Sequence, residues 1–420
     1  MRRADRKDTG RIDMQEKLWN KNFTLIIIGT VISMLGNSIS GFAIALLVLD
    51  NSSSTFLYAL FMVIYNAPKL IMPVFAGPYL DRYSRRKMIY GLDFLSAALY
   101  LAIFLILKFT AFNFALFTVL AFLIGSIDSI YKIAYDSLFP TLVTEGNYRK
   151  AYSISSIIEP LSTVMIPVAA FAYQKIGLEL MFLFNAVSFF TAATFETFIR
   201  AEERYTQNRF AQGFRAFRRT LAEGVSYIRA EKGLLFITLY FCFNAFAYSG
   251  TGVVTLPYFK ALGDNGVLLY TLVMGFGVLG RLAGGVAHYV TVIPKEKKFA
   301  LALCVYVAIS LMDGSYLYAP VFWMCVSTFV VGVISVTSYN IRISATQSYV
   351  PDACRARFNS TFQLLCNVGI IAGQLSAGAC ADVLPIRAVV SVYMGVNLAA
   401  ALLIILPNRE RIAPIYNREV

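Results

Sequence analysis

The chain has 420 residues, of which 58% are hydrophobic and only 15% are charged. A soluble domain carries roughly 25% charged residues, so this composition excludes an ordinary soluble protein. It predicts an all-α membrane protein, because the apolar runs are too long for barrel strands. The net charge of +13 is spread over the tails and several loops instead of one stripe, so no nucleic-acid partner is expected.

Apolar runs long enough to cross a bilayer follow one another along the chain. A helix needs roughly 20 apolar residues for one crossing, and twelve runs reach this length. They are 23–49, 54–78, 88–107, 113–138, 152–174, 179–199, 233–256, 266–290, 298–318, 320–347, 358–382 and 386–406. The runs predict twelve transmembrane helices in two pseudo-symmetric six-helix halves.

The polar segments define the expected domains. These are a tail at 1–22, a first half at 23–199, a linker at 200–232, a second half at 233–407 and a tail at 408–420. No signal peptide is expected, because no short apolar run in the first tail ends at a cleavage site. The halves show weak internal similarity where 142–153 aligns with 349–360. Such repeats are typical of transporters with a substrate site between the halves.

Lysine and arginine residues indicate which side faces the cytoplasm. Most of the 37 lie in the tails, the linker and alternate loops. The loops of the opposite side contain only Lys108, Lys175, Lys260 and Arg387. By the positive-inside rule, both termini are expected in the cytoplasm and the protein in the plasma (inner) membrane.

The linker is expected to contain an amphipathic helix. Its apolar residues recur at helical spacing, at Phe214, Phe217, Leu221, Val225 and Ile228. Basic residues lie off this stripe, so the helix is expected to rest on anionic lipids of the cytoplasmic leaflet. A helix that binds a partner protein is the alternative.

A short charged stretch after the second run carries a family resemblance. Its residues Gly77, Asp81, Arg82, Arg85 and Arg86 resemble, in spacing and position, the signature that the major facilitator superfamily carries between its second and third helices. The stretch departs from the usual pattern where Tyr79 replaces a Leu and Ser84 replaces a Gly. The resemblance covers the whole chain and implies the twelve-helix transporter fold.

Other stretches resemble one branch of that superfamily, the drug–proton antiporters that include bacterial macrolide exporters. They are 138–143, 221–229 and 347–351 with the following Arg357 and Phe358. In the fifth run the Pro of the antiporter signature is present as Pro167, but its glycines are missing.

The resemblance implies a secondary active transporter that works by alternating access. The expected function is proton-coupled efflux of lipophilic, often cationic, small molecules, with the proton gradient as energy source and no cofactor. The alternatives are a lipid or lysolipid translocator, an uncoupled facilitator, and a transporter-like sensor or scaffold. The chain is expected to act as a monomer. Direct drive by ATP is not expected, because the chain lacks a phosphate-binding loop. Neither an enzyme nor a metal site is expected, because the charges form no nucleophile–base set and the chain has a single His.

Charged residues inside apolar runs are candidates for proton or substrate binding, because burying a charge in a membrane costs roughly 2.5–3.5 kcal/mol on insertion scales. Asp128, Lys132 and Asp136 are four residues apart and share one helix face, either as a structural ladder or as a proton-exchanging surface. The remaining candidates are Lys69, Glu159, Arg281, Asn340 and Arg342. Gly280 and Gly284 flank one of them and predict close helix packing.

The signature stretch is expected to form a conformational latch between the halves. Asp81 should meet the start of the eleventh run near Arg357, where a helix N-terminus favours an anion. Arg85 or Arg86 should pair with Asp136. The full latch comprises Gly77, Asp81, Arg82, Arg85, Arg86 and Asp136.

Three other acids are assigned simpler roles. Asp93 and Glu196 are expected to be interfacial locks near cytoplasmic helix ends, and Asp313 is expected to be solvated near the outer end of its run. Aromatic side chains flank the charged positions and are candidates for lining a wide cavity, since aromatic walls suit lipophilic cations. They are Tyr131, Tyr135, Tyr240, Phe243, Phe246 and Tyr339.

Overall fold

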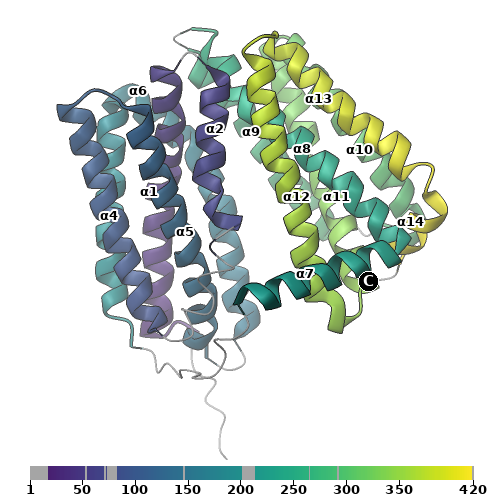
Figure 1. Ribbon diagram of the computed structural model, residues 1–420, viewed down its shortest axis with the longest axis horizontal. Helices are drawn as coiled ribbons and strands as arrows, with labels where there is room; N and C mark the ends of the chain where they lie inside the picture. Colours follow the sequence, from purple (N-terminus) through teal and green to yellow (C-terminus); the bar gives the residue numbers. More distant parts are fainter. Residues whose placement is uncertain are drawn as a thin grey trace, which may run out of the picture.

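A computed structural model describes residues 18–52, 54–70, 72, 83–144, 147–200, 213–263, 265–290 and 293–418 (Figure 1). Within these residues the secondary structure is helical, without strands. The helices before the linker are α1 (Lys21–Asn51), α2 (Thr55–Asn66), α4 (Arg85–Phe109), α5 (Phe114–Leu142) and α6 (Tyr148–Thr197). Then follow α7 (Gly213–Ala230), α8 (Lys232–Lys260), α9 (Gly266–Val290), α10 (Lys298–Ser315), α11 (Val321–Tyr349), α12 (Asp352–Ala381), α13 (Ile386–Ala400) and α14 (Arg409–Tyr416).

Ten stretches of the described residues are long and apolar enough to cross a membrane. Two predicted runs are not among them as separate helices. The run 54–78 overlaps α2 and lies partly outside the described residues, whereas 152–174 forms the first part of α6. A break in α6 occurs at Gly177, whose φ of 76° is readily adopted only by glycine. The all-helical membrane architecture is therefore confirmed.

Polar caps determine where several helices begin. The side chain of Asn20 accepts a hydrogen bond from the Phe23 amide at 2.8 Å, and Asn113 accepts one from the Leu116 amide at 3.0 Å. Ser84, a residue of the signature stretch, likewise accepts one from the Lys87 amide at 3.2 Å. Such caps satisfy amides that have no partner within the helix.

The helices pack as two bundles that stand side by side (Figure 1). In the first, α1 and α4 pack along α6; in the second, α8 packs on α12 and α9 on α11. The close packing predicted from Gly280 and Gly284 is confirmed. A methyl group at Gly284 would lie 2.6 Å from the carbonyl oxygen of Val333, and Gly280 lies equally tightly against Phe329.

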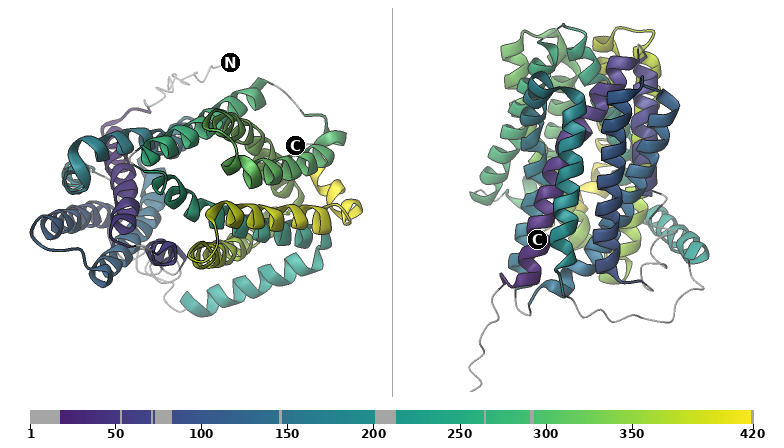
Figure 2. Two further views of the ribbon diagram at one scale, coloured as in Figure 1. Left: turned by 90° about the horizontal axis from the view of Figure 1, so that it is seen from above. Right: turned by 90° about the vertical axis from the view of Figure 1, so that its left-hand side faces the viewer.

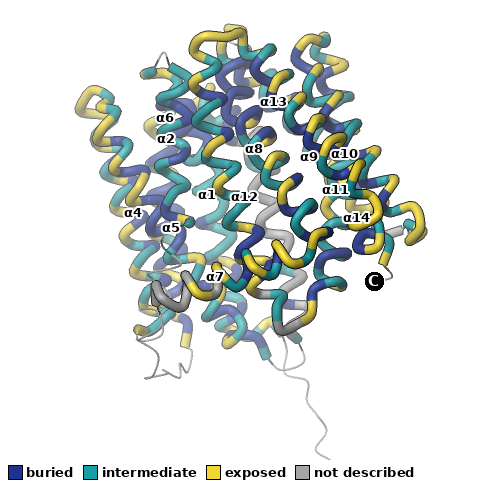
Figure 3. The backbone as a smooth tube through the Cα atoms, turned by 45° about the vertical axis from the view of Figure 1, so that its right-hand side comes forward, coloured by how far each residue is buried: buried dark blue, intermediate teal, exposed yellow. Residues whose placement is uncertain are grey.

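Exposed positions lie along the helices of both bundles (Figure 3), and many of them carry large apolar side chains. Phe109, Phe190, Val286, Phe322 and Leu403 are all exposed. An apolar surface this extensive is typical of contact with another apolar medium. It fits helices whose outer faces meet lipid chains.

Polar contacts between the two bundles gather at one end of the molecule, called here the distal end. It contains Asp50 at the end of α1, Lys260 at the end of α8 and Asp382 just after α12. Asp50 and Lys260 form an ion pair, and Asp382 bonds to the start of α2. Towards the opposite end, where Lys21 and Arg409 lie, α7 runs across the flank of the second bundle (Figures 1 and 2).

The helix α7 occupies the linker segment for which an amphipathic helix is predicted. Its Ile228 is 2% exposed and belongs to the core of the second bundle. Gly224 lies so close to Thr361 and to the Arg357 carbonyl of α12 that a larger side chain would collide. This end of the apolar stripe therefore packs on protein.

Candidate functional site

A polar cluster between α2 and α5 contains the first of the predicted residues, Asp128. The hydroxyl of Tyr65 donates a hydrogen bond to Asp128 Oδ2 at 3.1 Å. Lys69 Nζ lies 5.3 Å from the centroid of the Tyr65 ring and donates to Asn66 Oδ1 at 2.9 Å. Gly125, one turn before Asp128, allows this approach, because its α-carbon faces the Tyr65 carbonyl. The cluster thus joins a half-buried carboxyl to a cation on the neighbouring helix.

The other two charges of the predicted α5 ladder pair with each other. Lys132 Nζ lies 2.8 Å from Asp136 Oδ1, and the two side chains are 71% and 56% exposed. A pair as exposed as this adds roughly 0–1 kcal/mol to stability. Asp128 is therefore bonded to Tyr65 in this structure, and Lys132 pairs with Asp136.

The predicted latch lies only partly within the described residues. Gly77, Asp81 and Arg82 are outside them. Arg85 Nη1 donates to the carbonyl of Ser137 at 3.3 Å, next to Asp136 in the chain, and Arg86 Nη1 donates to the carbonyl of Ile199 at 2.6 Å. Both arginines therefore contact the ends of helices in their own bundle, and the latch remains a prediction.

The predicted aromatic residues occupy different environments. Tyr240 is fully buried in the second bundle with its ring centroid 4.5 Å from that of Tyr306. Phe246 stacks on Tyr393 at 5.0 Å, whereas Phe243 is exposed. Tyr135 is buried in the first bundle.

Arg342 of α11 is surrounded by aromatic rings. Its guanidinium carbon lies 5.0 Å from the centroid of Phe241, 5.4 Å from Tyr339 and 5.1 Å from Phe362. These rings supply cation–π attraction to a charge that pairs with no acid among the described residues. Asn340, two residues before Arg342 on α11, is half-buried. The side chain of Glu159 lies outside the described residues.

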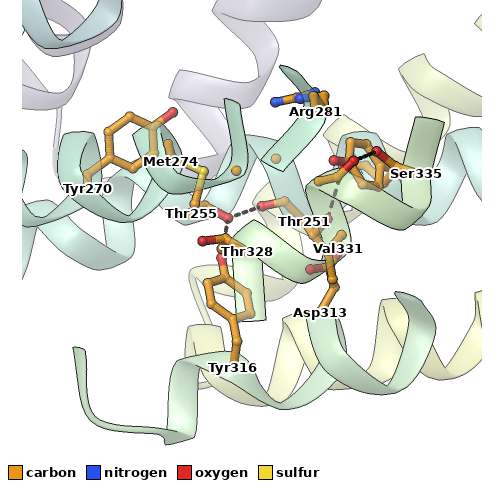
Figure 4. A pocket seen from close by; sticks show the side chains of 14 residues that line it. Thr251, Thr255, Tyr270, Met274, Arg281, Asp313, Tyr316, Thr328, Val331 and Ser335 are labelled. Atoms are coloured by element: carbon orange, nitrogen blue, oxygen red, sulfur yellow. Dashed lines mark hydrogen bonds between the residues drawn. The ribbon is translucent and has the colours of Figure 1, made fainter. Parts of the chain in front are cut away.

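A cavity of about 250 Å³ lies within the second bundle (Figure 4). One predicted residue, Arg281, lines it from α9, and Asp313 lines it from α10. The remaining walls come from α8, α9, α11 and the turn after α10. The labelled side chains there are Thr251, Thr255, Tyr270, Met274, Tyr316, Thr328, Val331 and Ser335.

The cavity combines aromatic walls with opposite charges. Thr255 bonds to the Thr251 carbonyl at 2.7 Å and lies 3.5 Å from the Tyr316 hydroxyl, so part of its polar wall is fixed. Small-molecule sites typically combine mostly apolar walls with a few placed polar groups. Asp313 was expected to be solvated, so its place in a cavity wall was missed. It is the only acid in the run 298–318, and this isolation was a usable signal.

Comparisons with known proteins define the family. The family model described as "Major Facilitator Superfamily" matches residues 26–312. A protein of Bacillus subtilis (strain 168), "Uncharacterized MFS-type transporter YkuC", is 26% identical over 308 residues, covering 69% of each chain. "Macrolide efflux protein A" of Streptococcus pyogenes is 21% identical over 231 residues, covering 55% of this chain and 56% of that protein.

Solved structures share the fold at low identity. A bacterial homologue of the iron transporter ferroportin in an inward-facing state gives a TM-score of 0.68 at 15% identity, covering 95% of this chain and 99% of that one. A peptide transporter POT mutant in complex with alafosfalin gives 0.67 at 15% identity, covering 96% and 97%. With a family match over more than half of its length, this chain is a multi-pass membrane transporter that belongs to the Major Facilitator Superfamily.

Proposed function

We propose that the protein is a proton-coupled exporter of lipophilic small molecules. The observation that carries the proposal is the cluster of Asp128, Tyr65 and Lys69. A carboxyl inside a membrane helix destabilises the protein, so its presence usually marks a functional site. Here it lies on α5 and bonds to Tyr65 of α2, whose ring faces the ammonium group of Lys69 just after that helix. A proton or a cationic substrate can therefore compete for the same carboxylate. The similarity to a macrolide efflux protein supports this substrate class.

The proposal includes the full predicted architecture. It takes twelve transmembrane helices in two six-helix halves, with α6 supplying two of them across Gly177. The lysine and arginine distribution favours cytoplasmic termini in the plasma (inner) membrane. In that orientation, bundles joined at the distal end correspond to an inward-facing state. Protons, anionic lipids at the cytoplasmic face and a single copy of the chain complete the functional unit.

The cavity around Arg281 and Asp313 is the proposed position for the substrate's polar groups. Its aromatic walls suit rings or alkyl chains, and its two charges suit a molecule that carries a basic or an acidic group. Arg342 and the aromatic rings around it are proposed to line the same transport route, on the side opposite the distal end.

Transport by purified protein in proteoliposomes tests the proposal. An imposed pH gradient should drive uptake of lipophilic cations or macrolides, and Asp128→Asn or Glu159→Gln should remove that dependence. Glu410→Gln on the exposed surface of α14 is the matched control. If Asp128→Asn and Glu159→Gln both keep the full gradient dependence, the proposal of proton coupling through these residues is wrong. Uptake of lysolipid without any response to the gradient would instead support a lipid translocator.

A further inference from the structure

Two acidic side chains lie fully inside the first bundle and are not bonded to the cluster at Asp128. Asp93 of α4 is 1% exposed and Glu196 of α6 is 0% exposed. Both were expected to be interfacial locks near the ends of their helices. Glu196 does lie one residue before the end of α6, but both side chains are buried inside the bundle.

The two carboxyl groups lie close enough to act on each other electrostatically, where α4 packs along α6. The Tyr131 hydroxyl of α5 donates to Glu196 Oε1 at 3.1 Å. Gly29 of α1 makes room for the glutamate, because a methyl group there would lie 3.2 Å from Glu196 Oε1. Asp93 Oδ2 and Glu196 Oε2 are buried and have no hydrogen-bond partner among the described residues. A proton shared between the two carboxyls would give these oxygens a hydrogen bond.

No cation compensates this pair among the described groups that act on it. The titratable groups that face it are Tyr131 and Asp128, both on α5, and Asp128 adds further negative potential. Lys87, the nearest basic residue before Asp93 on α4, is exposed, and Arg86, two turns before Asp93, is bonded to the Ile199 carbonyl. From α1, Gly29 faces Glu196 and has no charge.

Two buried carboxylates this close together in a medium of low dielectric cannot both stay ionised, so at least one of the two must hold a proton. We propose that Asp93 and Glu196 form a proton-binding site in the first bundle that holds one shared proton at neutral pH.

A link to the proposed transport cycle is built into α5. Asp128 and Tyr131 are three residues apart on this helix and therefore share a face. Asp128 meets α2 through Tyr65, and Tyr131 meets the buried pair through Glu196. The pair is thus placed to receive a proton that Asp128 gives up, and this role in coupling rests on the proposed function. The proton leaves one carboxyl oxygen and binds another, so no other reactant is needed.

Infrared difference spectroscopy of the protein in membranes tests the site without transport. At pH 7 exposed carboxyls, with ordinary pKa values near 4, are ionised, so a protonated-carboxyl C=O band should come from buried groups. Glu196→Gln and Asp93→Asn should each lose or shift the same component of this band. Asp136→Asn, which alters an exposed ion pair, should leave it unchanged. Each buried variant is close to isosteric and keeps a hydrogen-bond donor for its partner.

The band also reports the neighbour. Tyr131→Phe should shift the component without removing it, because only one hydrogen bond to Glu196 is lost. The site is refuted if both Glu196→Gln and Asp93→Asn retain the wild-type band. If one variant does not fold, the other decides the result.

A transport measurement separates the role in coupling from the proposed function. If the wild type responds to a pH gradient, Glu196→Gln should lose most of that response and keep its substrate binding. An unchanged response would overturn the coupling role. If the wild type shows no gradient dependence, the proposed function fails, while the infrared result still decides whether the proton-binding site exists.

Discussion

Asp382 caps the first turn of α2 from the opposite bundle by accepting a hydrogen bond from the Thr55 amide. The distance from the Thr55 nitrogen to Asp382 Oδ1 is 2.6 Å, and Asp382 Oδ2 accepts from the Ser54 hydroxyl, also at 2.6 Å. Free amides and the helix dipole make a helix N-terminus favourable for an anion. The carboxylate therefore stabilises the state in which the two bundles meet at the distal end, because these hydrogen bonds exist only while α2 and the end of α12 are in contact.

Replacing Asp382 by Ala should open the distal end. Losing a cap typically costs about 1 kcal/mol, which corresponds to a population change of roughly fivefold. Spin labels at Ala111 and Val383, both exposed, report the separation. The longer distance should gain population by about that factor. Asp382→Asn, which keeps one acceptor oxygen, should change the distribution less, and equal effects of the two variants would contradict the capping argument.

A second prediction concerns the close approach of α12 to α2 at Gly378. A methyl group there would lie 2.5 Å from the Ala59 methyl carbon and 3.1 Å from the Phe56 α-carbon. Gly378→Val should therefore wedge the helices apart and favour the same longer label distance.

Gly395→Val is the matched control for this wedge. A methyl group at Gly395 meets nothing within 4 Å, and the substitution changes helix propensity in the same way. It should leave the label distances as they are in the wild type. Equal opening by both substitutions would show that propensity, and not the contact with α2, is responsible.

The helices were largely predictable because polar residues mark both ends of each apolar run. The runs 23–49 and 320–347 lie within one or two residues of α1 and α11. The number of separate spans was harder to define, since α6 continues through two runs with a single break at Gly177. The predicted close packing at Gly280 also followed from local spacing alone.

Side-chain pairing was not predictable, because it depends on which helix lies opposite. Spacing on α5 allowed Lys132 to pair with Asp128 or with Asp136. The structure pairs it with Asp136, while Tyr65 from α2 supplies the bond to Asp128. Similarly, the place of Asp313 in a cavity wall depends on α8, α9 and α11 together. Nothing local in the sequence indicates that Asp93 would meet Glu196.

A third prediction concerns the ion pair between Asp50 of α1 and Lys260 of α8. Both side chains are partly buried, and the Tyr173 hydroxyl also donates to Asp50 Oδ2 at 3.2 Å. Asp50→Asn and Lys260→Gln should each increase distal opening, and the double variant should add little to either. A coupling free energy of about 1 kcal/mol is expected from the double-mutant cycle. Fully additive effects on the label distances would show that the pair does not act as a unit.

The last prediction concerns how α7 is attached to the second bundle. Glu223 of α7 accepts from Arg219 Nε at 2.8 Å, and its other oxygen lies 3.2 Å from Arg357 Nη1 of α12. The hydrogen bond from Arg219, followed by the charge of Arg357, lowers the pKa of Glu223 below its usual value of 4.5. Because the pKa of Glu223 is lowered in the attached state, its full contribution to the attachment of α7 is present above the usual pKa of 4.5. That contribution is lost as the pH falls through the lowered pKa.

Attachment of α7 should therefore be constant from pH 8 to about 5 and weaken only below about pH 4. Amide exchange of residues 221–230 measures it. Glu223→Gln should raise exchange at pH 7 and remove the acid response, while Glu410→Gln on the exposed face of α14 should do neither. The side chains of Arg219, Glu223 and Arg357 are all accessible to solvent, so salt screens their interactions. Added salt should therefore raise amide exchange in the wild type more than in Glu223→Gln. Equal salt responses would mean that α7 is held by Ile228 and the contact at Gly224 alone.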